Sequence, residues 1–403
     1  MMIGEAQLRH SMAAIRPPGR TGESARLRVL HVGKFYPPHM GGIETHLQAL
    51  CGELQKSLDL RVVVANDGGE SVAERLDGVD VLRVPTWATL ASTPLCPALT
   101  GEIRRSAADI LHLHLPNPMA VMAYLASGFS GPLVLSYHSD TVRQKVLGAL
   151  FSPFLELALR RSSAVIAASV AYQNSSPVLA RYLDRCHVIP YGIPLDRFEQ
   201  ADPIAAQKLR LQYGQRLVVS VGRLVYYKGF EYLIRAMARV DGKLLIVGTG
   251  PLRQTLQELA RSLNVAEKVV FLGQISDQEL IACYHAADVF ALASTARSEA
   301  FGLVQVEAMA AGLPVVNTKL DSGVPFVSLH EQTGLTVPPC DSEALAVAIN
   351  RLLNNPDLRR SLGEAARQRA RSEFSLDVMT SRTLGVYETV VKSTPPARKS
   401  LND

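Results

Sequence analysis

Residues 217–229 read LVVSVGRLVYYKG and combine a strand, a glycine turn and the beginning of a helix. The run at 217–221 is apolar or small throughout, which is typical of a strand covered on both faces of a parallel sheet. Gly222 permits a sharp turn after it, and the next helix begins at Gly229. The stretch therefore predicts a strand-helix unit, the element from which parallel sheets are built.

The same alternation continues on both sides of this stretch. After it, we expect strands at 243–247, 269–272 and 289–292, helices from Gly229, from Pro251 and at 302–311, and a helical region at 345–391. Before it, we expect strands at 27–33, 60–65, 109–114, 133–137 and 164–168, with a helix from about Ile43. Residues 189–194, IPYGIP, interrupt the pattern and predict a linker.

These elements predict an α/β protein with two doubly wound, Rossmann-like domains facing an interdomain cleft. A chain of 403 residues is too long for one compact core, which also favours two domains. We expect a disordered leader at 1–25, domains at 26–192 and 193–375, a helix at 376–395 that crosses back to the first domain, and a tail at 396–403. In such sheets ligands lie at the carboxyl ends of the strands, so the site is sought there.

Composition excludes several classes of protein. No apolar run approaches the roughly 18 residues that span a bilayer, and the leader lacks the apolar core of a signal peptide. A net charge of +5 and a pI near 8.9 are mildly basic; they fit an anionic ligand or membrane surface, and we predict no nucleic-acid partner. The five cysteines are scattered, as free thiols in a reducing cytoplasm would be: Cys51, Cys96, Cys186, Cys283 and Cys340.

Two cations lie close to the turn at Gly222. Gly222 and Arg223 end the strand, and Lys228 precedes the next helix, so both cations belong at the carboxyl edge of the second sheet. A guanidinium fork, an ammonium and a helix N-terminus suit a diphosphate held without a metal. On spacing alone, a pair of solvated surface cations is an equal alternative.

Residues 298–308, SEAFGLVQVEA, place one carboxylate in a loop and another on the following helix. Glu299 and Glu307 are too far apart for one helical face, but both could reach an elongated ligand. Between them, the amides of Phe301, Gly302 and Leu303 would point from a helix N-terminus towards phosphate. Taken alone, the segment also fits an ordinary helix start with a surface glutamate.

Two further glycine turns leave strands of the predicted sheets. Gly41 and Gly42 open the first helix and allow close approach of a ligand, although a plain turn is the simpler interpretation. Gly248 and Gly250 stand between a strand and a helix, without the third glycine of a dinucleotide-binding fingerprint. We read this second turn as the lining of a nucleotide site.

Histidines end two strands of the first domain. His138 follows one strand, and His112 and His114 end another, which favours ligand contact by at least one of them. No carboxylate or cysteine stands at ligand spacing to them, so we predict no metal site. Residues 142–161 mix apolar side chains with four cations, and they form either an ordinary crossover helix or one that lies on an anionic membrane.

Together these residues resemble the GT-B-type retaining glycosyltransferases of family 4, from about residue 27 to residue 391. The most specific likeness is Glu299-x₇-Glu307 with Phe-Gly-Leu between, followed by Gly222-Arg223-Leu224 with Lys228-Gly229. The paired glycines, the strand-end histidine and residues 333–339, TGLTVPP, also match.

The resemblance implies a role for each matched residue. Arg223 and Lys228 would neutralise the donor diphosphate as it leaves, and Gly42 would approach it from the first domain. Glu299, His138 and the amides at 301–303 would contact the transferred sugar, and Glu307 would hold the ribose. It further implies no cofactor, a UDP- or GDP-linked sugar as substrate, a glycan or lipid-linked acceptor, and a cytoplasmic enzyme in peripheral contact with the inner membrane.

One loop departs from the family pattern. Many relatives carry Gly-Gly-x-Pro-Glu where this chain has residues 322–326, SGVPF, so the loop lacks a carboxylate. The sequence there looks most like bacterial surface-polysaccharide mannosyl- and rhamnosyltransferases, which favours a GDP-mannose-type donor. Alternatives are a sugar-nucleotide isomerase of the same fold, a catalytically silent binding subunit and a nicotinamide-dependent oxidoreductase.

Overall fold

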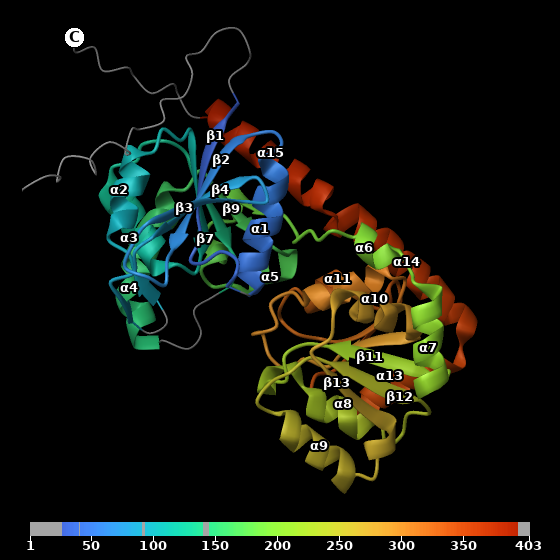
Figure 1. Ribbon diagram of the computed structural model, residues 1–403. Helices are drawn as coiled ribbons and strands as arrows, with labels where there is room; N and C mark the ends of the chain where they lie inside the picture. The colour runs from blue at the N-terminus through green and yellow to red at the C-terminus, as the bar shows by residue number, and fades with distance from the viewer. Residues whose placement is uncertain (1–25, 40, 91–92, 140–144, 394–403) are drawn as a thin grey trace, which may run out of the picture.

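The computed structural model describes residues 26–39, 41–90, 93–139 and 145–393, which form two large sheets with helices on both faces of each (Figure 1). The expected leader at 1–25 and the tail at 396–403 lie outside the described residues. The α/β fold class with two doubly wound sheets is confirmed.

The first sheet has the order β10-β9-β8-β7-β1-β2-β4-β3, and β3 is its one antiparallel strand in the described part of the chain. Its strands are β1 (Arg28–Val32), β2 (Asp59–Ala65), β3 (Val72–Leu76), β4 (Val79–Val84), β7 (Ile110–Leu115), β8 (Leu133–Tyr137), β9 (Ala164–Ala167) and β10 (Cys186–Val188). β5 (Ala88–Leu90) and β6 (Thr93–Leu95) pair as a separate antiparallel hairpin.

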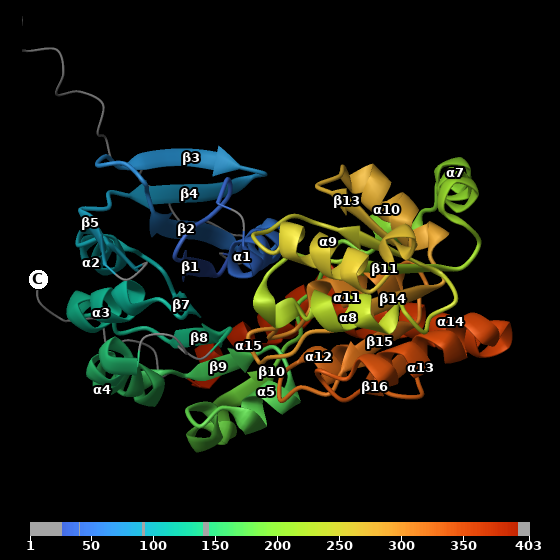
Figure 2. The ribbon, with the colours of Figure 1, turned by 90° about the horizontal axis from the view of Figure 1, so that it is seen from below.

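Helices cover this sheet on both sides. One apolar core joins it to α1 (Gly42–Leu54) and α15 (Leu376–Ser393), which lie side by side (Figure 1). A second core joins the other face to α2 (Ala98–Arg105), α3 (Pro118–Ser127), α4 (Lys145–Arg161) and α5 (Val170–Ser175). Figure 2 shows α2, α3 and α4 gathered on the side of the molecule away from the second sheet.

The second sheet is parallel throughout, in the order β13-β12-β11-β14-β15-β16. Its strands are β11 (Leu217–Val221), β12 (Lys243–Val247), β13 (Val269–Gly273), β14 (Val289–Leu292), β15 (Val315–Thr318) and β16 (Gly334–Val337). One face carries α6 (Asp196–Glu199), α7 (Pro203–Tyr213), α10 (Asp277–Ala286), α11 (Leu303–Ala310), α12 (Val324–Val327) and α14 (Pro356–Phe374). The other carries α8 (Phe230–Ala236), α9 (Arg253–Ser262) and α13 (Ser342–Asn354).

Each strand that the sequence predicted is present, β11 with all five residues buried. The region at 345–391 is helical, as predicted, and consists of three helices. Asn355 caps α14 with its side chain and Pro356 begins it, so α13 ends before them.

The chain crosses between the two sheets twice, and the crossings touch. The backbone amide of Ile193 donates to the carbonyl of Phe374 at 3.0 Å, and Ile193 also bridges to Ser375. A Cβ on Gly192 would lie 2.5 Å from the Ser375 carbonyl oxygen, so only glycine allows this approach. The linker at 189–194 and the start of α15 therefore form one joint.

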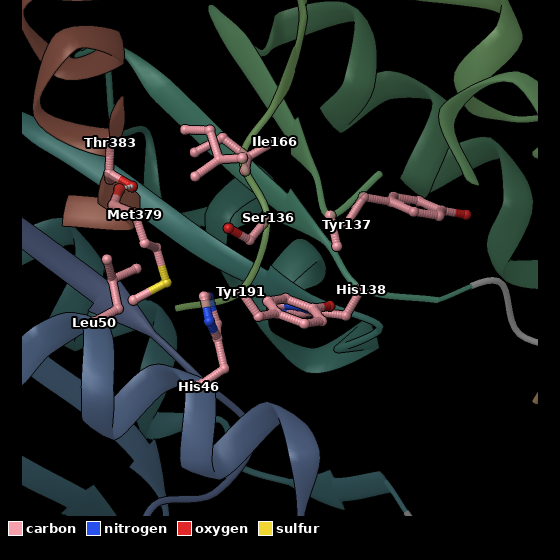
Figure 3. A pocket seen from close by; sticks show the side chains of 11 residues that line it. His46, Leu50, Ser136, Tyr137, His138, Ile166, Tyr191, Met379 and Thr383 are labelled. Carbon is pink, nitrogen blue, oxygen red and sulfur yellow. Dashed lines mark hydrogen bonds between the residues drawn. The ribbon is translucent and has the colours of Figure 1, made fainter. Parts of the chain in front are cut away.

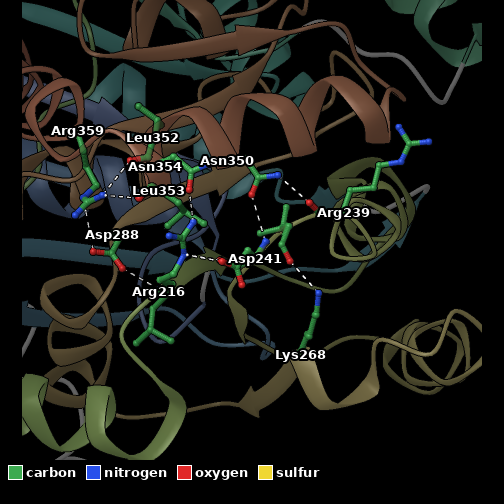
Figure 4. A network of polar contacts seen from close by, with 12 residues as sticks. Arg216, Arg239, Asp241, Lys268, Asp288, Asn350, Leu352, Leu353, Asn354 and Arg359 are labelled. Carbon is green, nitrogen blue, oxygen red and sulfur yellow. Dashed lines mark hydrogen bonds and ion pairs between the residues drawn. The ribbon is translucent and has the colours of Figure 1, made fainter.

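A polar network ties down the amino ends of the second sheet, far from the edge where ligands are expected. Asp288, just before β14, accepts hydrogen bonds from the backbone of Leu217 at 2.9 Å and from Arg210 at 3.2 Å. Arg359 of α14 adds an ion pair at 3.7 Å (Figure 4). This network holds helices to the sheet and leaves the opposite edge free for chemistry.

Candidate active site

The centre of the candidate site is an ion pair between the two loops that the sequence singled out. The Nζ atom of Lys228 lies 2.5 Å from an Oε atom of Glu299, and both side chains are almost buried, with exposed fractions of 11% and 9%. Ser294 donates a hydrogen bond to the same carboxylate at 3.1 Å. The sequence analysis predicted neither the contact of Ser294 nor the pairing of Lys228 with Glu299. Lys228 follows β11, whereas Ser294 and Glu299 follow β14, so the spacing in sequence does not show that they meet.

Glycine makes the approach of these loops possible. Gly229 has a φ of 65°, and a Cβ there would lie 2.0 Å from the Ala293 carbonyl oxygen. The amide of Thr295 also donates to the Tyr227 carbonyl at 2.8 Å. The loop carrying Lys228 is thus fastened to the loop after β14 that carries Glu299.

The turns after β11 and β12 pack backbone against backbone. Gly222 has a φ of 155°, and a Cβ there would meet the Lys228 side chain at 3.3 Å. A Cβ on Gly248 would lie 2.1 Å from the Gly222 carbonyl oxygen, and one on Gly250 would lie 2.5 Å from that of Leu224. Bare backbone therefore lines this edge beside the Lys228 ammonium.

Arg223 differs from Lys228 in its surroundings. Its side chain is exposed, and within the described residues the guanidinium forms no hydrogen bond or ion pair. It stands directly after Gly222, at the same sheet edge as Lys228. The structure thus leaves Arg223 available to an external anion without fixing where its side chain points.

The segment after Glu299 enters α11 through a left-handed residue. Gly302, with a φ of 74°, precedes the helix, so the amide of Leu303 begins it without an intrahelical acceptor. The ring of Phe301 is buried and packs edge-on against Tyr191, with ring centroids 5.0 Å apart. The linker between the domains therefore touches the loop that carries Glu299.

The loop at 322–326, in which the family carboxylate is missing, supports this segment from behind. The amide of Gly323 donates to the Ala300 carbonyl at 2.7 Å. Arg369 of α14 donates to the carbonyls of Phe326, at 2.8 Å, and Val327, at 3.0 Å. The loop is thus bonded to Ala300 through Gly323 and to α14 through Arg369.

Glu307 lies on α11 and is partly buried. It accepts a hydrogen bond from the Tyr284 hydroxyl of α10 at 2.7 Å. Burial raises the pKa of the Glu307 carboxyl, and the Tyr284 bond opposes that shift. Tyr284 is a contact that the sequence could not reveal, since it is brought to Glu307 by the packing of two helices.

Gly41 and Gly42 begin α1 in the first domain. A Cβ on Gly41 would collide with the Glu44 carboxylate, whereas a Cβ on Gly42 would meet nothing within 4 Å. Internal packing therefore does not require glycine at position 42, which leaves room beside the helix N-terminus for a ligand.

Five buried histidines, rather than the three that the sequence singled out, come together between the first sheet and α1. All are buried: His31 on β1, His46 on α1, His112 and His114 on β7, and His138 after β8. Burial lowers the pKa of each, to about 3 for His31 and about 4 for His46. The histidines are therefore neutral near pH 7.

Both ring nitrogens of His138 have protein partners. Its Nε2 lies 3.1 Å from Nδ1 of His114. Its Nδ1 lies 2.8 Å from the hydroxyl of Tyr191, which lies beside it in Figure 3. A cavity of ≈ 10 Å³, close to the room that one water molecule needs, borders His46, His138 and Tyr191. A sugar hydroxyl on Nδ1 of His138 would take the place of Tyr191.

Two groups of three histidines could hold a metal ion: His31 with His112 and His114, and His46 with His114 and His138. The ligand nitrogens of each group lie within 4.8 Å of one another. Both groups share His114, whose nitrogens already bond to His31, at 3.0 Å, and to His138. A metal would have to replace those bonds.

The region suggested for membrane contact is described in part. Residues 142–144 lie outside the described residues, and α4 exposes Leu150, Phe154 and Leu157. Its Phe151 and Leu155 pack against the core instead. No helix in the described ranges is long and apolar enough to span a bilayer.

Family models match both halves of the chain. Residues 40–197 match "Glycosyltransferase Family 4", and residues 202–369 match "Glycosyl transferases group 1". The first match includes the linker at 189–194, and the second begins shortly after it.

Three full-length relatives are similar at about the same level. A D-rhamnosyltransferase of Pseudomonas aeruginosa is 31% identical over 87% of this chain and 92% of its own. The O-antigen chain mannosyltransferase C of Escherichia coli is 30% identical over 91% and 100%. A GDP-mannose-dependent alpha-(1-6)-phosphatidylinositol monomannoside mannosyltransferase of Mycolicibacterium smegmatis is 32% identical over 89% and 96%.

The fold also resembles solved structures. The crystal structure of Anabaena HepE in complex with UDP is 23% identical, with a TM-score of 0.76 over 90% of this chain and 100% of that one. This likeness spans both sheets and confirms the GT-B architecture.

Proposed function

Because the chain belongs to the group 1 glycosyltransferases of family 4, we propose that it transfers a hexose from a nucleotide diphosphate sugar, without a metal and with retention of anomeric configuration. The observation that carries the proposal is the buried pair of Lys228 and Glu299 beside bare glycine backbone and the start of α11. This site combines a fixed cation, a fixed carboxylate and helix-end amides, which suit a diphosphate joined to a sugar.

The chemistry follows from the charges. Departure of a nucleoside diphosphate builds negative charge, which Lys228, Arg223 and the amides at 301–303 would stabilise electrostatically. The bound diphosphate would compete with Glu299 for the Lys228 ammonium. Glu299 could then accept hydrogen bonds from sugar hydroxyls, while the leaving phosphate takes the proton of the acceptor hydroxyl.

We further propose a mannose-type sugar on GDP. Support comes from the relatives, which include a GDP-mannose-dependent enzyme and an O-antigen mannosyltransferase. Glu307 would hold the ribose, and the base would lie near Gly248, Gly250 and Gly273. Arg253 borders that place, with one guanidinium nitrogen 3.1 Å from the position of a Cβ on Gly273.

The acceptor in this proposal is a glycan or a lipid-linked glycan, met at the cytoplasmic face of the inner membrane. Relatives named for a phosphatidylinositol mannoside and for an O-antigen chain support it. Exposed Leu150, Phe154 and Leu157 on α4, which ends in Arg160 and Arg161, suit peripheral contact with an anionic surface.

The test is a thermal-shift screen with GDP-, UDP-, ADP- and dTDP-sugars, with EDTA present. We expect GDP-mannose to raise the Tm most. A ligand at about 100 times its Kd stabilises the folded protein by about 2.7 kcal/mol, which a thermal melt detects. Glu299→Gln should weaken the shift, whereas Glu258→Gln on exposed α9 should not. Transfer to a lipid-linked acceptor is then assayed with the best donor.

Other outcomes would contradict the proposal. Conversion of the free nucleotide sugar without acceptor would show an isomerase, and donor binding without any turnover would show a silent subunit. Activity abolished by EDTA and restored by Mg²⁺ or Mn²⁺ would show that the Arg223 and Lys228 mechanism is incomplete.

A further inference from the structure

A continuous hydrogen-bonded path runs through the buried histidines of the first domain. From the Tyr191 hydroxyl it passes to His138 at 2.8 Å, to His114 at 3.1 Å and to His31 at 3.0 Å. It continues to the Tyr387 hydroxyl at 3.1 Å, to His112 at 2.6 Å and to Ser136 at 2.8 Å. Each of the four histidines on the path uses both ring nitrogens.

The order of the nitrogens along this path is regular. Going from Tyr191 to Ser136, the path enters every ring at Nδ1 and leaves it at Nε2. Neutral imidazole has one donor and one acceptor nitrogen. As long as the Tyr387 hydroxyl donates one of its two bonds, all bonds can be made in two ways only: all four histidines carry the proton on Nε2, or all four carry it on Nδ1. If the Tyr387 oxygen accepted from both rings, its own buried O–H would be left without an acceptor on the path.

A mixed set of tautomers would break the path. Where two directly bonded rings disagree, two lone pairs or two N–H groups would face each other, and where His31 and His112 disagree, the Tyr387 O–H or one ring nitrogen would lose its partner. A buried polar group without a partner is costly. The rings have no room to turn away, since His112 and His114 stack at 4.6 Å and His114 and His138 at 5.4 Å. The tautomers are thus coupled across three strands and α15.

The two ends of the path decide between the two states. Tyr191 offers a phenol, which is a stronger acid and hydrogen-bond donor than the hydroxyl of Ser136. Donation from Tyr191 into Nδ1 of His138 sets every later bond in the same direction, ending with Ser136 as acceptor. This direction places the proton of all four rings on Nε2.

We propose that His31, His112, His114 and Tyr387 are positioning residues that hold His138 as the neutral Nε2–H tautomer, with an Nδ1 lone pair that accepts a hydrogen bond. Tyr387 belongs to α15, so the helix that returns from the second domain supplies the central link. In the free protein the acceptor is occupied by Tyr191. That a donor-sugar hydroxyl replaces Tyr191 there, and donates to His138, rests on the proposed function.

The tautomers can be measured without any substrate. Full-length protein with ¹⁵N-labelled histidine, at about pH 7.5, should show four neutral Nε2–H rings in long-range ¹H–¹⁵N spectra. Tyr191→Phe and Ser136→Ala, which remove the end partners, identify His138 and His112 by the signals that move.

Tyr387→Phe tests the link in the middle. It should shift the signals of His31 and His112, and it should lower kcat about five- to tenfold with little change in donor KM, as expected for loss of one positioning hydrogen bond. Tyr182→Phe is the matched control, because its hydroxyl bonds to Glu156 outside the path. That variant should leave the histidine signals and kcat unchanged.

Each remaining outcome overturns some or all of the proposal. Mixed tautomers, or a charged ring among the four, would mean that the path does not couple them. Four Nδ1–H rings would keep the path intact, but Nδ1 of His138 would then donate a hydrogen bond instead of accepting one. Uniform Nε2–H rings in a protein that transfers no sugar would leave the path intact and remove the proposed function.

Discussion

Glu307 is held on α11 by the Tyr284 hydroxyl, in surroundings that raise the pKa of its carboxyl. A carboxyl with a raised pKa stabilises the folded chain most below the ordinary pKa of glutamate, near 4.3, and that contribution is lost as the pH rises through the raised value. At neutral pH the folded protein therefore bears a cost for keeping this group ionised.

We predict that Glu307→Gln raises the Tm at about pH 7.5 and changes it little at about pH 4. The same substitution should weaken binding of the donor nucleotide by roughly 1–2 kcal/mol, because a charged acceptor of ribose hydroxyls is lost. Calorimetry and thermal melts measure the two effects. Glu258→Gln, at an exposed position, should alter neither, and unchanged donor affinity in Glu307→Gln would remove the ribose role.

The buried histidines make stability depend on pH in the opposite sense. Their pKa values are lowered on folding, so the unfolded chain binds protons that the folded chain does not. We predict that the free energy of unfolding is highest above about pH 6.5 and falls below it, by up to about 1.4 kcal/mol per pH unit for each histidine.

Urea unfolding at about pH 7.5, 6.5 and 5.5 measures this dependence. His46→Gln removes one titrating histidine and should reduce the slope by the share of that histidine. The substitution breaks no hydrogen bond at Nδ1, because that atom has no partner among the described residues. Gln332→Ala, at an exposed position without a titratable side chain, should not change the slope. A stability that stays flat to about pH 5 would contradict the neutral cluster.

At this scale the sequence predicted residue types better than their contacts. Lys228 and Glu299 were identified separately as parts of a phosphate and sugar site, and the structure shows them paired. Tyr191 and Tyr284 were missed, because each reaches its partner across elements that are distant in sequence. Arg223 stays a prediction, since no contact of the described chain fixes its guanidinium.

Among the elements, α1 offers a direct test of the diphosphate approach. Gly42 at its start has open space where a Cβ would stand, and so does Gly385 inside α15. We predict that Gly42→Ala folds normally and weakens donor binding about tenfold, because the methyl group would occupy the place of a phosphate oxygen.

Gly385→Ala is the control for helix propensity alone. It should gain about 0.5–1 kcal/mol of stability and bind donor as the wild type does. Both variants are compared by thermal melts and by titration with the best nucleotide. Equal donor affinity in the two would place the diphosphate away from α1.

Three of the strands that the sequence did not predict lack an unbroken apolar run. β3 is mostly exposed and antiparallel at the sheet edge, so it does not have the run that marks a buried parallel strand. β15 and β16 have four residues each and include polar ones, VVNT and GLTV, unlike the equally short β9 and β14, which are apolar throughout. The buried strands β1, β7, β8, β11 and β14 carry the candidate site, and all were predicted.

For the molecule as a whole, the joint between the domains lies beside the candidate site. Tyr191 contacts His138 of the first domain and Phe301 of the second, and Gly192 next to it touches Ser375 at the start of α15. Any change in the angle between the domains must therefore move Tyr191 relative to one of its two partners. The linker was predicted from its prolines and glycine, but this contact was not, because nothing in 189–194 indicates what packs against it.

Because the two crossings touch at Gly192, we predict that one methyl group added there has a large effect on stability and turnover. In Gly192→Ala the new Cβ would lie 2.5 Å from the Ser375 carbonyl oxygen and 3.0 Å from the Met379 Cβ, so the two crossings must separate. We expect a loss of about 1–3 kcal/mol of stability, as for overpacking elsewhere, and a larger radius of gyration by X-ray scattering. We also expect kcat to fall more than the fraction of unfolded protein explains, since Tyr191 is pulled away from His138 and Phe301. Gly52→Ala, in α1 with nothing within 4 Å of its Cβ, should show none of these changes. A Gly192→Ala variant with wild-type scattering and turnover would mean that the crossings give way locally, and that the joint does not set the geometry of the site.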